Sequence, residues 1–159
     1  EIYYILNFVS SFDFLILSYF QFFYFISLKV NRVMKVKNLD HNVLTVQDID
    51  VTCGFYEKVL EMELVVFGEG RKALKFGNKK INLHLLENEF EPKALKPTPG
   101  SMDLCLITET PMDMIIELLK DKNIPLIKEP VKRTGDLGEI LSIYIRDPDL
   151  NLLEISNYD

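Results

Sequence analysis

The chain has 159 residues, of which 48% are hydrophobic and 26% are charged, and this composition suits one globular domain with a hydrophobic core. Its formal net charge is −6 and its pI is near 5.0. Nucleic-acid binding needs a basic surface against the phosphates, and the short basic pairs Lys35/Lys37 and Lys79/Lys80 do not provide one. The charge therefore excludes nucleic acid as an expected partner.

Two cysteines, Cys53 and Cys105, lack the spacing of a CxxC or zinc-binding motif. Neither a disulfide framework nor a cysteine-bound metal is expected, and the chain fits a reducing, cytoplasmic compartment. We interpret both cysteines as small buried hydrophobic residues, with a catalytic thiol as the alternative.

The first 33 residues differ in composition from the rest. They hold 11 of the 18 Phe and Tyr residues, and their acidic side chains are Glu1 and Asp13. The run 12–28 has the length and apolarity of a membrane helix or signal anchor. However, the chain starts with Glu1 rather than Met, and no basic segment precedes the run. We favour translated upstream sequence with Met34 as the natural start; the alternatives are a membrane or signal segment and an extension that packs on a partner.

Residues 39–86 predict a helix at 50–60 among four strands. Asp48 or Asp50 is placed to cap this helix. The helix has one apolar face, made by Val51, Phe55 and Val59. The predicted strands are 39–46, 63–67, 72–76 and 80–86.

A linker at 87–101, with prolines at 92, 97 and 99, leads to a second half in the same order. Its helix is predicted at 111–123, with Pro111 in the first turn. Its predicted strands are 101–108, 124–131, 139–147 and 151–156. Each half is thus a βαβββ module. The repeat predicts an α+β fold, a curved eight-stranded sheet with the helices outside and a cleft on the other face.

Aligning the two halves places polar residues at equivalent strand positions. Superposing the last strands puts His84 on Glu154, and superposing the first strands puts His41 on Asp103. Two imidazoles and two carboxylates suit a divalent ion with open positions, and zinc, nickel, iron, manganese and cobalt are all compatible. The alternative for each histidine is a hydrogen-bonded structural role, and Asp103 could instead orient a ligand.

The strand 139–147 alternates in polarity. Ser142, Tyr144 and Arg146 lie opposite its apolar side chains, so we expect them to line the cleft. Arg71 and Arg133 lie in predicted loops at the rim, where they could anchor an anionic group. Ordinary surface polarity is the alternative for these five substrate-binding candidates.

Five segments in order carry a family likeness: LDHNVLTVQDID, FYEKVLEMEL, FGNKKINLH, PGSMDLCLIT and IYIRDPDLNLLEISNY. They resemble the vicinal oxygen chelate superfamily of glyoxalases, bleomycin-resistance proteins and extradiol dioxygenases. They are most similar to the glyoxalase domain-containing protein 5 group. The resemblance covers about residues 34–159 and implies two modules, about 37–90 and 100–157, around a divalent metal, often in a homodimer. Leu150 and Glu61 stand where the family usually has glycine.

The resemblance assigns metal ligands to His41, His84 and Glu154, and Asp103 stands where most metal-dependent members have histidine. It implies a glyoxalase I-like lyase or isomerase that acts on a small vicinal-oxygen substrate through a metal-stabilised enediolate, with Glu154 as the catalytic base. One alternative is an extradiol-type dioxygenase with ferrous iron on two histidines and a carboxylate. The other is a bleomycin-resistance-like protein that binds a small molecule without turnover.

Overall fold

The computed structural model describes Tyr19 and residues 33–158. Apart from Tyr19 and Val33, the segment 1–33, with the membrane or signal helix considered for it, lies outside the described residues. Contacts divide the chain into two compact units, Glu1–Asn38 and Leu39–Asp159. Among the described residues, no helix combines the length and the apolar composition that a membrane crossing requires. The predicted boundary at Met34 stays a prediction.

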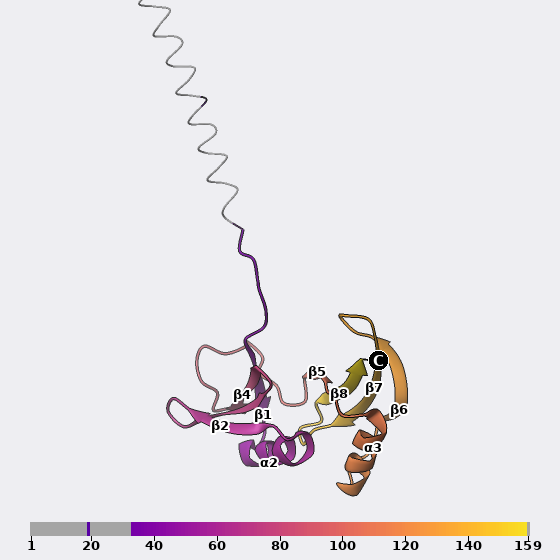
Figure 1. The fold of residues 1–159 in the computed structure, drawn as a ribbon. Coiled ribbons are helices and arrows are strands. Elements are labelled where there is room, and N and C mark those ends of the chain that lie inside the picture. Colours follow the sequence, from indigo (N-terminus) through magenta and orange to yellow (C-terminus); the bar gives the residue numbers. More distant parts are fainter. Residues whose placement is uncertain (1–18, 20–32, 159) are drawn as a thin grey trace, which may run out of the picture. The chain divides into compact units, whose positions relative to one another are not determined.

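The second unit has the predicted α+β organisation of two βαβββ modules (Figure 1). The first module comprises β1 (His41–Val46), α2 (Ile49–Leu60), β2 (Glu63–Phe67), β3 (Arg71–Phe76) and β4 (Lys79–Leu85). The second comprises β5 (Asp103–Ile107), α3 (Met112–Asp121), β6 (Lys128–Thr134), β7 (Glu139–Arg146) and β8 (Leu152–Tyr158).

The eight strands form two four-stranded sheets rather than one continuous hydrogen-bonded sheet. Sheet A has the order β1-β4-β3-β2 and sheet B the order β5-β8-β7-β6. In each sheet the first and last strands of the module are parallel neighbours, and the other pairs are antiparallel. The chain therefore builds the same half-structure twice, as the internal repeat predicted.

Helix α2 begins at the cap that the sequence indicated. The Asp48 carboxylate accepts hydrogen bonds from the backbone N–H groups of Asp50 (2.8 Å) and Val51 (3.0 Å), so Asp48 is the N-cap. The predicted apolar face is only partly correct, because Val51 is 55% exposed. The buried residues of the helix are Thr52, Cys53 and Tyr56.

Strand β6 lies four residues later than predicted at its start. The apolar run 124–127 suggested a strand, but Ile124 and Leu126 pack against the core from a loop. The pairing with β7 also shifts between Lys128 and Val131, a region that contains Pro130. Apolar residues of a loop that packs on the core and of a strand give the same sequence pattern, which explains the error.

Glu61 and Leu150 adopt left-handed backbone conformations, with φ of 53° and 69°. Glu61 is the C-cap of α2, and Leu150 lies in the turn between β7 and β8. A side chain in this region costs roughly 1–2 kcal/mol relative to the right-handed helical conformation. These are the two positions where the family likeness leads one to expect glycine, so the turns persist without it.

A buried carboxylate joins the two modules. Asp147 accepts hydrogen bonds from the Tyr56 hydroxyl (3.0 Å), from both the backbone and side-chain nitrogens of Asn151 (2.8 Å each) and from the Asp149 backbone (3.0 Å). Asp149 in turn accepts from the backbone of Gln47 (3.2 Å). Burial and the nearby charge of Asp147 raise the pKa of Tyr56 above its usual range, so its hydroxyl remains a donor.

We expect Tyr56→Phe to lower the free energy of unfolding by about 1–3 kcal/mol, because the buried Asp147 carboxylate loses a donor. Urea denaturation measures this change. Tyr158→Phe is the matched control, because the Tyr158 hydroxyl accepts one exposed backbone hydrogen bond from Leu137; its effect should stay within about 0.5 kcal/mol. Equal losses in the two variants would contradict a special role for Asp147.

Candidate functional site

Each sheet packs one face on the core and turns the other face away from it. In sheet A the core face includes Leu44, Val46, Ile81 and Leu83. Alternation and the parallel register put the intervening residues on the opposite face, which we call the open face of sheet A. On β1 and β4 its members are His41, Val43, Thr45, Lys80, Asn82 and His84.

The open face of sheet B contains the residues expected to line the cleft. Glu154 pairs with Cys105 on β5 and with Tyr144 on β7, so the three side chains form one row. Ser142 belongs to the next row, where its hydroxyl lies 2.8 Å from that of Ser156, and it is fully buried. The strand parity read from the sequence therefore places Ser142 and Tyr144 on the same face as Glu154.

Strand pairing determines which residues of the two modules are equivalent. Asn82 lies two residues beyond the β4 partner of His41. Glu154 likewise lies two residues beyond the β8 partner of Asp103. Asn82 is therefore the counterpart of Glu154, and the expected equivalence of His84 with Glu154 is wrong by two residues. Sequence comparison aligned the apolar patterns of the strands but could not supply their register.

The structure does not bring His84 next to His41. The β1 partner of His84 is Thr45, four residues from His41, which is about 13 Å at the rise of a strand. Among the described residues, no group of three or more His, Cys, Asp or Glu side chains is close enough to hold a metal ion. The expected ligands are instead divided, with His41 on sheet A and both Asp103 and Glu154 on sheet B.

Two oxygen atoms mark the equivalent positions. Of the buried side-chain nitrogen and oxygen atoms in the described part of the chain, Asn82 Oδ1 and Glu154 Oε1 have no hydrogen-bond partner. A buried polar atom without a partner costs roughly 1–3 kcal/mol. Because the two atoms occupy counterpart positions in the two modules, we interpret both as ligand-binding atoms rather than as packing defects.

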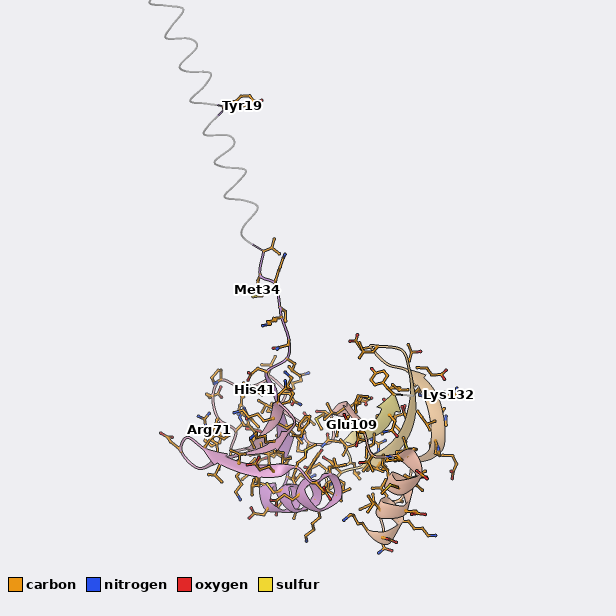
Figure 2. All side chains as sticks on the ribbon, viewed as in Figure 1. Tyr19, Met34, His41, Arg71, Glu109 and Lys132 are labelled. Atoms are coloured by element: carbon orange, nitrogen blue, oxygen red, sulfur yellow. The ribbon has the colours of Figure 1, made fainter. Side chains whose placement is uncertain are left out.

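His41 has one ring nitrogen held by a neighbouring carboxylate. Its Nδ1 lies 2.7 Å from the Asp40 carboxylate, and its side chain is 43% exposed. The hydrogen bond to His41 and the charge of its ring lower the pKa of Asp40. A carboxylate that holds one ring nitrogen orients the other toward a metal. Figure 2 shows His41 at the N-terminal end of β1, on the same sheet as Arg71.

The polar side chains near Glu154 already have partners. Arg133 Nε donates to the Tyr144 hydroxyl at 2.9 Å, and Arg146 donates to the Leu150 carbonyl at 2.9 Å. Both Arg71 and Arg133 lie within strands rather than in the predicted loops. Arg133 is thus placed to orient Tyr144, whereas the Arg71 guanidinium lies over an aromatic ring.

Sequence reasoning missed Asn82 and misplaced Cys105. Asn82 shares the strand parity of Lys80 and His84, but an asparagine gave no metal signal beside the two histidines. Cys53 is buried as expected, whereas Cys105 is exposed because it lies on the open face of sheet B, with its Sγ 3.6 Å from Ser156 Oγ. The expectation of a buried residue is wrong for Cys105.

Comparison with known proteins agrees with the fold. The model of the Glyoxalase/Bleomycin resistance protein/Dioxygenase superfamily matches residues 38–155. The chain belongs to this glyoxalase superfamily. Members of the superfamily typically bind a divalent metal, and the imidazole, amide and carboxylate groups at the equivalent positions are chemically suited to one.

Two relatives share more than half of the aligned sequence. Virulence protein STM3117 of Salmonella typhimurium is 56% identical over 125 residues, which are 79% of this chain and 87% of the relative. Its crystal structure has a TM-score of 0.78 and covers 79% of this chain and 100% of its own. Glyoxalase domain-containing protein RDO1 of Mycosarcoma maydis is 52% identical over 127 residues, 80% of this chain and 72% of the relative.

A lactoylglutathione lyase from Agrobacterium tumefaciens shares the superfamily fold at a TM-score of 0.61, with 20% identity over 77% of this chain and 95% of its own. Together the family match and these structures confirm the resemblance read from the sequence and the two-module fold. They do not identify the reaction or the residues of the site.

We expect Asn82→Leu to raise the free energy of unfolding of the metal-free protein by about 1 kcal/mol, because it removes an unpaired buried oxygen. The control is Asn157→Leu, because Asn157 donates to the carbonyls of Thr108 and Thr110 and should lose stability on substitution. Urea denaturation in the presence of a chelator measures both. Destabilisation by Asn82→Leu comparable to that of the control would show that Asn82 has a structural partner.

Proposed function

We propose that this protein is a metal-dependent lyase or isomerase of the glyoxalase I type that acts on a small vicinal-oxygen substrate. The proposed ligands are His41, Asn82, Asp103 and Glu154, with Asn82 in place of the His84 first expected. The observation that carries the proposal is the pair of unpaired buried oxygens at counterpart positions of the two modules. Two carboxylates in the set would balance the charge of a divalent ion, and the N and O donors leave its identity among zinc, nickel, iron, manganese and cobalt open.

We propose that each metal site is formed by residues from two copies of the chain. His41 and Asn82 lie on one sheet and Asp103 and Glu154 on the other, without a cluster of three acidic, His or Cys ligands in the described residues. A homodimer in which sheet A of one protomer faces sheet B of its partner would complete two equivalent sites. The open faces also expose Val43 (48%) and Ile107 (52%), apolar side chains that such a partner would cover.

The residues around Glu154 fit proton abstraction. A bound divalent ion would supply Lewis-acid stabilisation of the charge that develops on vicinal oxygens. Glu154 would be a ligand before the substrate binds, and in the substrate complex the same oxygen, which lacks a protein partner, would be released to accept the carbon-bound proton. Tyr144, opposite Glu154 in the strand register and bonded to Arg133, would hold the substrate beside this carboxylate.

The geometry favours this reaction over the alternatives. An extradiol-type dioxygenase needs two histidines and a carboxylate on ferrous iron, and His84 is too far along the sheet from His41 to share an ion with it. A binding protein without turnover would not require a metal. We also propose a cytoplasmic location, a small-molecule partner and no nucleic-acid partner, on the basis of the acidic charge and the two free thiols.

We expect metal-stripped protein to bind about one Mn²⁺ or Ni²⁺ per chain in calorimetric titration. Asn82→Ala and Glu154→Gln should weaken binding by about tenfold or more, because each removes a donor. His84→Ala should bind as the wild type does, since His84 lies outside the proposed ligand set. Loss of the metal in His84→Ala but not in Asn82→Ala would overturn the ligand assignment, and no binding by the wild type would sink the enzyme proposal.

Mixing variants tests whether the site is shared between chains. We expect His41→Ala and Glu154→Ala to bind metal poorly alone, because each damages both sites of its homodimer. After mixing and subunit exchange, the heterodimer should contain one intact site, formed by sheet A of the Glu154→Ala chain and sheet B of the His41→Ala chain. Recovery of metal binding supports the shared site, whereas an unchanged mixture would place all four ligands within one chain.

A further inference from the structure

The open face of sheet A carries a second polar group that the proposed metal site does not use. His84 lies near the C-terminal end of β4 and is 8% exposed, yet its ring nitrogens have no hydrogen-bond partner among the described residues. Its ring packs edge-on against Phe90, with 5.6 Å between the ring centroids. Its nitrogens are not among the fully buried atoms without a partner, so they reach the surface of the sheet, where a ligand can bind them.

Arg71 lies beside His84 without an acidic ion-pair partner, whereas Lys80 lies four residues before His84 on the same strand, about 13 Å away. The Arg71 guanidinium is 5.0 Å from the centroid of Phe67 and 5.5 Å from that of Phe90. The Lys80 ammonium is 4.3 Å from the Phe67 centroid. In the described part of the chain, no carboxylate forms an ion pair with Arg71 or Lys80. The rings hold the cations in place and leave their donors free.

The segment that follows β4 holds Phe90 in contact with Arg71 and His84. The Glu89 side chain is 3% exposed, and it accepts hydrogen bonds from the Lys93 ammonium (2.8 Å) and from the backbone of Glu87 (3.1 Å). These bonds hold the chain on either side of Phe90, which contacts both Arg71 and His84. The charges that act on His84 are those of Glu89, Arg71 and Lys93, and because Lys93 pairs with Glu89, Arg71 is the cation left facing His84.

We propose that Arg71 and His84 bind a carboxylate of the substrate, so that the substrate class is a small vicinal-oxygen acid. This inference rests on the proposed function for the position of the reacting oxygens. His84 lies two residues beyond Asn82 on β4, about 7 Å along the strand, so a short aliphatic chain separates the carboxylate from those oxygens. The Arg71 fork matches a carboxylate in two hydrogen bonds, and the His84 ring adds a further donor.

A matched pair of probes isolates the carboxylate. 2-Oxoadipate and 2-oxohexanoate share a 2-oxo acid group, and 2-oxoadipate has a second carboxylate at its far end. We expect metal-loaded wild type to bind 2-oxoadipate at least about tenfold more tightly in calorimetric titration. Arg71→Gln should abolish this preference without weakening 2-oxohexanoate. Lys75→Gln removes the same charge from the same face but from a residue paired with Glu63, and it should retain the preference.

Because the chain has two histidines, the NMR signals of His84 can report on the carboxylate subsite independently of metal binding. Their ring C–H signals can be assigned in NMR spectra with His41→Gln and His84→Gln. We expect 2-oxoadipate, and not 2-oxohexanoate, to shift the His84 signals even in metal-free protein, so the subsite is supported even if no metal binds. Protein that binds metal but shows no preference, or that loses the preference equally in Lys75→Gln, would overturn the subsite alone.

Discussion

The buried Asp147 carboxylate is the constraint on which the rest of the domain depends. An ionised carboxylate in the interior costs several kcal/mol unless its oxygens are hydrogen-bonded, and Asp147 is held by donors from Tyr56, Asp149 and Asn151. Asn151 also accepts from the backbone of Met102 at 2.8 Å, just before β5. One network thus fixes the start of β5, the β7–β8 turn and the position of α2, and with them the two strands that carry the acidic half of the site.

The Asp147 network and the hydrophobic core let the domain tolerate residues that lower its stability. The unpaired oxygens of Asn82 and Glu154 and the left-handed conformation of Leu150 each cost free energy. A hydrophobic core that runs through both modules offsets these costs. The concentration of unfavourable polar atoms on the open faces, rather than at random, is the pattern expected where binding rather than folding determines the residue.

The sequence was sufficient for the fold because period-two and helical patterns, the Asp48 cap and the internal repeat all agree on the same elements. It was insufficient for register. Whether His84 or Asn82 is the counterpart of Glu154 depends on how β4 aligns with β1, and a shift of two residues preserves the same face, so polarity alone cannot detect it. Cys105 was misplaced for a related reason. Its strand is largely apolar on both faces, so the sequence pattern did not show that one of these faces is exposed.

The distribution of charge relates the proposed carboxylate subsite to the proposed metal site. The chain carries a net charge of −6, yet Arg71 forms no ion pair with a carboxylate in the described structure, and it lies beside His84, whose ring forms no hydrogen bond there. The contacts of the Arg71 guanidinium with Phe67 and Phe90 stabilise the fold only modestly. A local positive region in a negative field instead selects where an anion settles. The substrate carboxylate would thus be held at His84 while its vicinal oxygens reach Asn82, so a single strand, β4, would set both the orientation and the length of the substrate.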